Sequence, residues 1–392
     1  MVRTARLWVT KADVYTPNGI VRRGNLLVNE QGIIEAVCEE GPLPEPPQGV
    51  EIVDAEGKRL LPGFIDVHVH GGNGYRMMDA TPRDLDEMSR FHASRGTTAF
   101  LATTDADAEE RLVAALHNAA ASRRRELPGA ALLGVHLEGP YIDLKRSGAM
   151  DKRTLRPPDL DELRRLLVAS DHCIRIVTMA PELPGGMEAV SWLADRGITV
   201  SVGHSDATYE QMVEAVRRGA RHTTHHFNGM SPLHHREPGV AGAGLMLPEL
   251  TTELIADGFH VHPAAAKLLF DVKGPEGLCL ITDAVRCAGL PDGDYGSIRM
   301  IDGMVMLQDG SSLAGSSLTT IGALRNMAAF TGYGIERLLP ALTETPARQA
   351  GVSDRKGAIA RGKDADFLLL GDDDTVEATY VEGREVYRHD FR

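Results

Sequence analysis

After residue 62 the chain alternates short apolar segments with longer amphipathic ones, and this alternation limits the possible folds more than any other feature. Helical patterns such as 85–94, 159–169 and 209–218 lie between most of the strand-like segments. Such an alternation builds a parallel sheet, and eight strand–helix units are the number that closes into a TIM-like (β/α)8 barrel. The expected strands are 63–68, 97–103, 131–137, 174–179, 199–202, 221–224, 252–256 and 278–282.

Further strand patterns occur at both ends of the chain, outside the barrel series. Segments 25–28 and 32–37 near the start, and 365–370 and 379–387 near the end, are short, apolar and bounded by turn residues. We expect these ends to meet in one small β-sandwich domain. The predicted α/β organisation assigns residues 1–58 and 353–392 to that domain and residues 59–352 to the barrel.

Composition and charge exclude several classes of protein. Of the 392 residues, 43% are hydrophobic and 25% are charged, which is ordinary for a soluble enzyme. The formal net charge of −13 argues against a nucleic-acid partner, and the chain lacks an apolar stretch of about 18 residues that would span a membrane. Residues 1–9 read as a strand rather than a secretory signal, so we expect a cytoplasmic protein.

Polar side chains stand at the carboxyl ends of the expected strands, where barrel enzymes carry their chemistry. His68 and His70 end the first strand, and their spacing places both imidazoles on the same side of it. Taken singly, any of these residues could be a satisfied core histidine or a helix-capping carboxylate. The series as a whole favours a catalytic metal site. It continues with Glu138, His204, His225, His260 and Asp283.

These residues lie in segments that resemble the amidohydrolase superfamily and, within it, the N-acetylglucosamine-6-phosphate deacetylases. Histidine pairs after a first strand are common to many amidohydrolases, whereas Leu-Glu-Gly-Pro, Gly-His-Ser and Arg-Glu-Pro-Gly together are more specific. The resemblance covers nearly the whole chain in order. The matching segments are 62–70, 137–141, 203–208, 224–230, 236–239, 256–261, 282–284 and 313–319.

The resemblance implies one or two divalent metal ions in each subunit. One would be held by Glu138, His204 and His225, and a second by His68 and His70 with Glu138 as the bridge. A carboxylate with two imidazoles leaves a position for water, as catalytic sites require. The expected metal is zinc, with iron, cobalt and manganese as alternatives.

The resemblance also implies roles in catalysis and substrate binding. Asp283 would act as general base and acid, and His260 would contact the sugar. Asn228 and Gly229 would bind the 6-phosphate, together with Arg236 from the neighbouring subunit of a homodimer. By pattern alone, residues 313–317 are only a turn before a helix. The other expected substrate contacts are Ala149, Met150, Asp257, Gly258, Phe259, Leu313, Ala314 and Gly315.

Two positions depart from the pattern of the resembled family. Met150 stands where that family usually has a histidine, and a thioether cannot replace an imidazole donor. Arg286 lies in the segment after Asp283, which is usually small and apolar. We expect Arg286 to enter the pocket, and expect either change to shift substrate preference or to tune affinity.

The predicted reaction is hydrolysis of the N-acetyl amide of N-acetylglucosamine 6-phosphate to glucosamine 6-phosphate and acetate. Alternatives are an amidohydrolase acting on a related N-acetylated amino-sugar phosphate, a cyclic amide or an N-acyl amino acid. A non-catalytic scaffold on the same fold is the alternative from another class. Such proteins typically lose ligands, and here all the expected ligands and Asp283 are present.

Overall fold

The computed structural model describes residues 5–38 and 49–390, so the first four residues of the expected N-terminal strand lie outside it. Eight parallel strands run in chain order around one sheet. Each strand lies within one residue of its expected bounds, which confirms the barrel series. The strands are β6 (Phe64–Val69), β9 (Thr97–Thr104), β10 (Ala131–Glu138), β11 (Ile174–Met179), β12 (Thr199–Val202), β13 (Ala220–Thr223), β14 (Thr251–Ile255) and β15 (Leu278–Ile281).

The first and last strands of this sheet meet and close the barrel. The backbone N–H of Asp283 donates to the carbonyl of His68 at 3.0 Å, and the N–H of His70 donates to the carbonyl of Ala284 at 2.9 Å. Thr282 adds a side-chain hydrogen bond of 2.6 Å to the buried carboxyl group of Asp66. The closing contacts therefore tie together the two strand ends that carry His68, His70 and Asp283.

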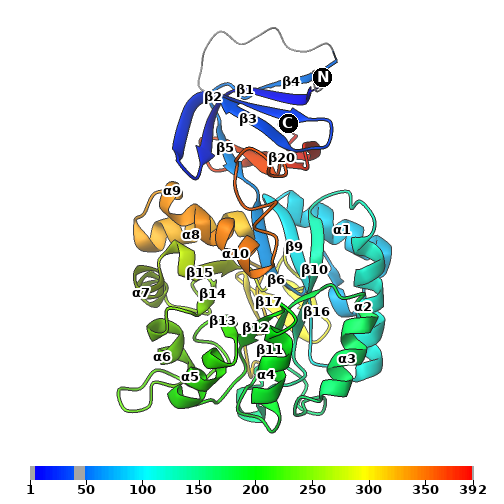
Figure 1. Ribbon diagram of the computed structural model, residues 1–392, viewed down its shortest axis with the longest axis vertical. Coiled ribbons are helices and arrows are strands. Elements are labelled where there is room, and N and C mark those ends of the chain that lie inside the picture. Colours follow the sequence, from blue (N-terminus) through cyan, green and yellow to red (C-terminus); the bar gives the residue numbers. More distant parts are fainter. Residues whose placement is uncertain (1–4, 39–48, 391–392) are drawn as a thin grey trace.

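Helices surround the barrel, as Figure 1 shows. Their starts follow from the sequence: Thr81 and Thr208 form capping boxes with Asp84 and Gln211, and Asp159 caps a third helix. Their apolar faces pack on the outer faces of the strands. The helices are α1 (Pro82–Ala93), α2 (Glu109–Arg123), α3 (Leu160–Ala169), α4 (Gly186–Ala194), α5 (Tyr209–Arg217), α6 (Gly239–Met246), α7 (Pro263–Lys273), α8 (Thr320–Thr331), α9 (Ile335–Leu338) and α10 (Glu344–Gln349), with short 3-10 turns at Met77–Asp79, Leu144–Arg146, Pro275–Gly277 and Leu339–Leu342.

Strands from both chain ends form a second sheet, which lies above the barrel in Figure 1. The prediction that the two ends combine is confirmed. The division into domains at residues 58 and 352 stays a proposal, and the terminal sheet includes Arg59–Pro62, four residues beyond the first of these limits. The strands are β1 (Ala5–Thr16), β2 (Gly19–Asn29), β3 (Ile34–Cys38), β4 (Glu51–Asp54), β5 (Arg59–Pro62), β19 (Phe367–Leu370), β20 (Val376–Val381) and β21 (Arg384–Arg388).

The path from β5 into β6 orients the barrel. Because Gly63 alone separates these strands, the amino ends of the barrel strands face the terminal sheet and their carboxyl ends face away from it. A buried ion-pair cluster strengthens the return of the chain from the barrel to β19. In it, Lys356 Nζ lies 2.9 Å from Asp364 and 2.7 Å from Asp366.

Small β elements beyond the barrel series extend the loops after β6 and β15. β7 (Gly71–Gly72) pairs with β8 (Tyr75–Arg76), and β16 (Gly293–Tyr295), β17 (Ile298–Ile301) and β18 (Met304–Leu307) form a three-stranded sheet. The β17–β18 turn is Asp302-Gly303, with φ of 50° and 78°. Such a turn joins antiparallel strands tightly. Among the described residues, no helix is both long and apolar enough to cross a membrane.

Candidate metal centre and active site

A cavity of about 590 Å³ opens at the carboxyl ends of the barrel strands. It brings together thirteen of the eighteen predicted site residues and also Arg286. His68 lies beneath this surface with none of its side chain exposed. Arg236, Asp257, Gly258 and Phe259 are not part of the lining. The predicted residues that line it are His70, Glu138, Ala149, Met150, His204, His225, Asn228, Gly229, His260, Asp283, Leu313, Ala314 and Gly315.

The first expected ligand group converges at the ends of β10, β12 and β13. Glu138 Oε1 lies 3.4 Å from His204 Nε2 and 3.2 Å from His225 Nε2. The two imidazole nitrogens are 3.0 Å apart. All three side chains are buried.

The hydrogen-bond partner of each Nδ1 determines whether the Nε2 of the same ring carries a hydrogen or a lone pair. His204 Nδ1 lies 2.7 Å from the carbonyl of Arg146, and His225 Nδ1 lies 3.1 Å from the carbonyl of Asn228. A carbonyl only accepts, so each Nδ1 carries the hydrogen and each neutral ring has a lone pair on Nε2. Two lone pairs and a carboxylate oxygen then face one another at short range, an arrangement that fits a divalent cation.

The second group lies beside the first. His68 Nε2 and His70 Nε2 are 3.2 Å apart, and His70 Nε2 lies 3.1 Å from Glu138 Oε2. The other oxygen of Glu138 contacts the first group, so the geometry suits a bridging carboxylate. Asp283 Oδ1 lies 3.5 Å from His68 Nε2 and 3.3 Å from His70 Nε2. Asp283 is thus a candidate ligand for the second cation as well as a candidate base.

Two acids that were not predicted from the sequence, the buried Glu253 and the partly exposed Asp105, lie beside this second group. His68 Nδ1 lies 2.9 Å from Glu253 Oε2, and His70 Nδ1 lies 2.8 Å from Asp105 Oδ1. Arg76 forms an ion pair with Asp105 from the other side. Glu253 accepts the Nδ1 hydrogen of His68, which directs the Nε2 lone pair toward the centre, and Asp105 places a negative charge beside the ring of His70.

The electrostatics of the centre favour positive charge among its acids. Burial lowers the pKa of His70, but Asp105 and Glu138 outweigh it and raise that pKa to about 10. Burial likewise opposes ionisation of Glu138, yet His68 and the neighbouring imidazoles hold the pKa of its carboxyl group well below the ordinary range. A site with this bias binds either protons or a metal cation.

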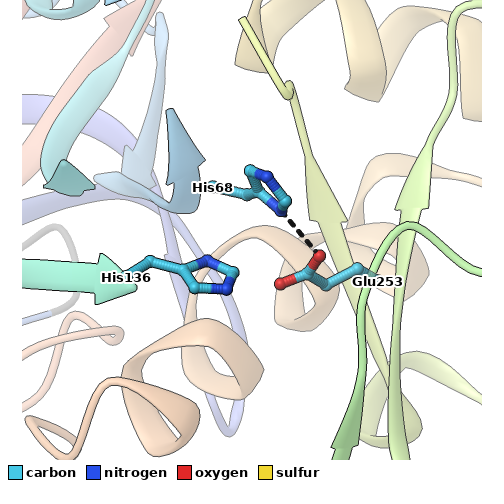
Figure 2. A group of neighbouring side chains, drawn as sticks. All are labelled: His68, His136 and Glu253. Atoms are coloured by element: carbon cyan, nitrogen blue, oxygen red, sulfur yellow. Dashed lines mark hydrogen bonds and ion pairs between the residues drawn. The ribbon is translucent and has the colours of Figure 1, made fainter. Parts of the chain in front are cut away.

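A third cluster lies deeper in the barrel, where His136 and Glu253 point toward His68 (Figure 2). Both nitrogens of His136 are already engaged. Its Nδ1 donates to the carbonyl of Val67 at 2.9 Å, and its Nε2 accepts from the hydroxyl of Thr178 at 2.7 Å. We therefore interpret this cluster as support for His68 rather than as another metal site.

Unusual backbone conformations orient the side chains at the strand ends. His204, His225 and Asp283 have φ of 50°, 28° and 51°, in the left-handed region that non-glycine residues seldom adopt. Such strain persists where surrounding contacts enforce it, and it is common at active sites. Gly229, with φ of 58°, packs so closely on the imidazole of His204 that a Cβ there would lie 2.9 Å from Nδ1.

The expected substrate contacts lie in different places around the cavity. His260 lines it, and its Nδ1 lies 2.7 Å from Asp257 Oδ2. Burial opposes protonation of His260, but Asp257 raises its pKa above the ordinary value. Phe259 is 48% exposed and does not line the cavity. Asp257 does not line it either, but it contacts His260, which does.

Both departures from the resembled family lie at the cavity wall. Met150 lines the cavity, and its sulfur accepts from the backbone N–H of Ala106 at 3.5 Å. Arg286 also lines the cavity, and its guanidinium lies 3.5 Å from Asp79. The β16–β18 sheet adds Ile298 to the same wall. The sequence signal for that sheet is the Asp302-Gly303 turn, and the sheet was not among the predicted strands.

Arg236 lies apart from the cavity of its own chain. It is exposed on the loop between β13 and α6, and its backbone N–H donates to His234 Nδ1 at 3.3 Å. Within one chain this guanidinium is not among the residues around the metal ligands. Its predicted contact with a neighbouring active site stays a prediction.

Comparison with known proteins places this geometry among related chains. The amidohydrolase family matches residues 59–386. N-acetylglucosamine-6-phosphate deacetylase of Bacillus subtilis (strain 168) is 41% identical over 383 residues, which cover 96% of each chain. N-acetylgalactosamine-6-phosphate deacetylase of Escherichia coli O157:H7 is 38% identical over 90% of this chain and 92% of that protein. A mutant N-acetyl-D-glucosamine-6-phosphate deacetylase from Mycobacterium smegmatis, solved in complex with N-acetyl-D-glucosamine-6-phosphate, superposes with a TM-score of 0.90 at 32% identity, covering 98% of this chain and 99% of that one.

Proposed function

Because the chain belongs to the amidohydrolase family, we propose that it hydrolyses the N-acetyl amide of N-acetylglucosamine 6-phosphate, giving glucosamine 6-phosphate and acetate. The convergence of Glu138, His204 and His225 beside Asp283 at the base of one cavity carries this proposal. The near full-length similarity to the deacetylase of Bacillus subtilis supports the choice of substrate. The phosphate of this substrate does not cross a membrane unaided, so we also propose a cytoplasmic location.

The chain is a metal-dependent hydrolase, and we propose that its imidazole and carboxylate side chains determine which divalent cation it binds. Glu138, His204 and His225 would hold one divalent ion, and His68 and His70 a second, with Glu138 shared. Bound there, a divalent cation polarises the amide carbonyl and makes water a stronger nucleophile at neutral pH. Imidazole and carboxylate ligands suit zinc, which we propose as the metal, with iron, cobalt and manganese as alternatives.

We propose that Asp283 moves the protons of the reaction. Its carboxylate stands at the cavity wall, 3.3 Å from His70 Nε2, on the same side as the ligands of both groups. In the proposed mechanism it accepts a proton from the attacking water and passes it to the nitrogen of the departing amine. The amine then leaves in its neutral form, which is a much better leaving group than the amide anion.

Residues around the mouth of the cavity would orient the sugar. His260 Nδ1 lies 2.7 Å from Asp257 Oδ2, so in the neutral ring Nε2 carries the lone pair, and we propose that it accepts a hydrogen bond from a sugar hydroxyl. Leu313 and Ala314 supply apolar surface on the wall next to Asp283. We propose that the acetyl methyl group rests on this surface while the amide carbonyl faces the metal ligands.

Recognition of the phosphate would join residues of two chains. Asn228 and Gly229 line the cavity, and we propose that they contact the phosphate. We propose that the exposed Arg236 completes the phosphate site of a neighbouring subunit in a homodimer, through charge-assisted hydrogen bonds.

Mixed subunits would test that arrangement. Arg236→Ala and Asp283→Asn chains combined under subunit exchange would produce heterodimers with one intact site and one doubly defective site. Activity should rise above that of either parent. If exchange is verified and no activity returns, Arg236 does not act across a subunit boundary.

A substrate panel tests the proposed reaction itself. Purified protein supplied with zinc should release acetate from N-acetylglucosamine 6-phosphate and act poorly on the unphosphorylated sugar. N-acetylgalactosamine 6-phosphate is the second candidate, because Met150 and Arg286 alter the cavity wall and a relative from Escherichia coli is named for that substrate. Preference for a cyclic amide or an N-acyl amino acid, with neither sugar phosphate hydrolysed, would contradict the proposal.

A further inference from the structure

Glu253 is a buried acid in the middle of β14, away from the cavity surface, and none of its side chain is exposed. Its Oε2 accepts from His68 Nδ1 at 2.9 Å and from the backbone N–H of His225 at 3.0 Å. Its Oε1 lies 3.1 Å from His222 Nε2. Figure 2 shows the contact with His68 inside the barrel. One oxygen therefore contacts a member of each metal-ligand group.

We propose that Glu253 is a positioning residue that couples the two halves of the metal centre, so that loss of its carboxylate weakens cation binding at both. This inference rests on the proposed function only in requiring that the two ligand groups bind metal. It concerns no substrate, and its test can succeed or fail whatever the enzyme hydrolyses.

The contact with His68 acts on the second group. Acceptance of the Nδ1 hydrogen fixes the tautomer in which Nε2 holds the lone pair that faces His70 and Glu138. An anionic acceptor also makes the imidazole more basic and therefore a stronger ligand. Without that acceptor, His68 is free to adopt the other tautomer, whose Nε2–H would point at the metal position.

The contact with His225 acts on the first group. His225 holds a left-handed backbone, with φ of 28°, and its N–H would lose its partner if Glu253 were removed. An unpaired buried N–H is costly, so the local backbone would relax toward an ordinary conformation. His225 Nε2 would then move away from Glu138 and His204.

Other supporting acids act on one group only, which makes them useful for comparison. Asp105 forms charge contacts with His70 Nδ1 and with the guanidinium of Arg76. It therefore lies next to the second ligand group. Removing the charge of Asp105 should therefore weaken the second cation and leave the first in place. Glu253 differs because its contacts reach both groups.

The test compares Glu253→Met with the control Asp105→Asn. Methionine has a volume close to that of glutamate and removes both acceptor oxygens, whereas the amide of Glu253→Gln would keep one oxygen toward His68 and His225. Asp105→Asn removes the negative charge beside His70. Zinc affinity and stoichiometry would be measured by competition with a chelator, without substrate, and folding by circular dichroism and thermal unfolding.

We expect Glu253→Met to lower the affinity for both zinc ions, by roughly 10–100-fold, because hydrogen-bond partners of metal-binding histidines commonly have effects of this size. Asp105→Asn should lower only the second affinity. Unchanged affinities in folded Glu253→Met, or a loss confined to the second ion as in the control, would overturn the coupling.

If Glu253→Met fails to fold, a measurement on the unaltered protein tests the role of Glu253 instead. Nitrogen-15 NMR of the histidines in the zinc-loaded protein should show His68 protonated at Nδ1 and bound through Nε2. Protonation at Nε2, or coordination through Nδ1, would overturn the role of Glu253, because its carboxylate lies on the Nδ1 side of the ring.

Discussion

Replacing Asp283 by asparagine exchanges one oxygen for nitrogen at the point where the mechanism needs a proton acceptor. The side chain is 10% exposed, and its shape is kept by the exchange. The backbone should also be kept. Its N–H donates to the His68 carbonyl at 3.0 Å, its carbonyl accepts from Ser316 at 2.8 Å, and asparagine tolerates the φ of 51° as well as aspartate does.

The loss should therefore fall on turnover rather than on folding. A general acid–base group commonly contributes about 10²–10⁴-fold to rate, and this range corresponds to about 2.7–5.4 kcal/mol of barrier. We expect kcat for acetate release to fall by at least about 100-fold. The cation bound by Glu138, His204 and His225 should remain, because none of those contacts involves Asp283.

The assay measures acetate release, KM and bound metal together. Asp151→Asn is the matched control, because Asp151 lines the same cavity but pairs with the surface residue Arg153. The control should keep kcat near that of the unaltered enzyme. If Asp283→Asn with its first cation in place turns over within about threefold of the unaltered enzyme, Asp283 is not the proton carrier.

Three other perturbations test separate parts of the molecule. Arg236→Ala should raise KM for the phosphorylated substrate at least about tenfold, since a hydrogen bond to a charged group contributes about 1.5–3 kcal/mol; an equal change for the unphosphorylated sugar would contradict a phosphate contact. The affinity of the second cation should rise at least about tenfold per pH unit between pH 7 and 9, because binding must displace a proton from His70, whose pKa is raised to about 10, and because Glu138 and Glu253 outweigh burial and also raise the pKa of His68; calorimetry showing a flat profile would refute this. Lys356→Met should lower the free energy of unfolding by about 3 kcal/mol, because it leaves the buried Asp366 without its partner; chemical denaturation should show little change in the control Arg361→Met, whose side chain is exposed.

The barrel and most of the ligands could be predicted because both depend on local pattern. Each strand is a short apolar run, and a polar residue just after such a run is placed at the carboxyl end by the direction of the chain. The same rule would have found Asp105, which directly follows Thr104 at the end of β9.

Glu253 was harder to predict because it lies within a strand, not after one. In β14 it alternates with Thr252 and Leu254, a pattern equally typical of a strand with one solvated face. Only the closed barrel shows that this face points inward, toward His68. Arg236 illustrates a different limit, because its proposed role in a neighbouring chain cannot be tested from the contacts within one chain.

Removal and return of metal test the central claim most directly. The enzyme would be stripped with a chelator, shown by circular dichroism to remain folded, and titrated with zinc while acetate release from N-acetylglucosamine 6-phosphate is followed. Activity should vanish on stripping and return in proportion to the zinc bound, and a His204→Ala protein should not recover. Full activity in the stripped, folded protein would contradict a metal-dependent deacetylase built on Glu138, His204 and His225.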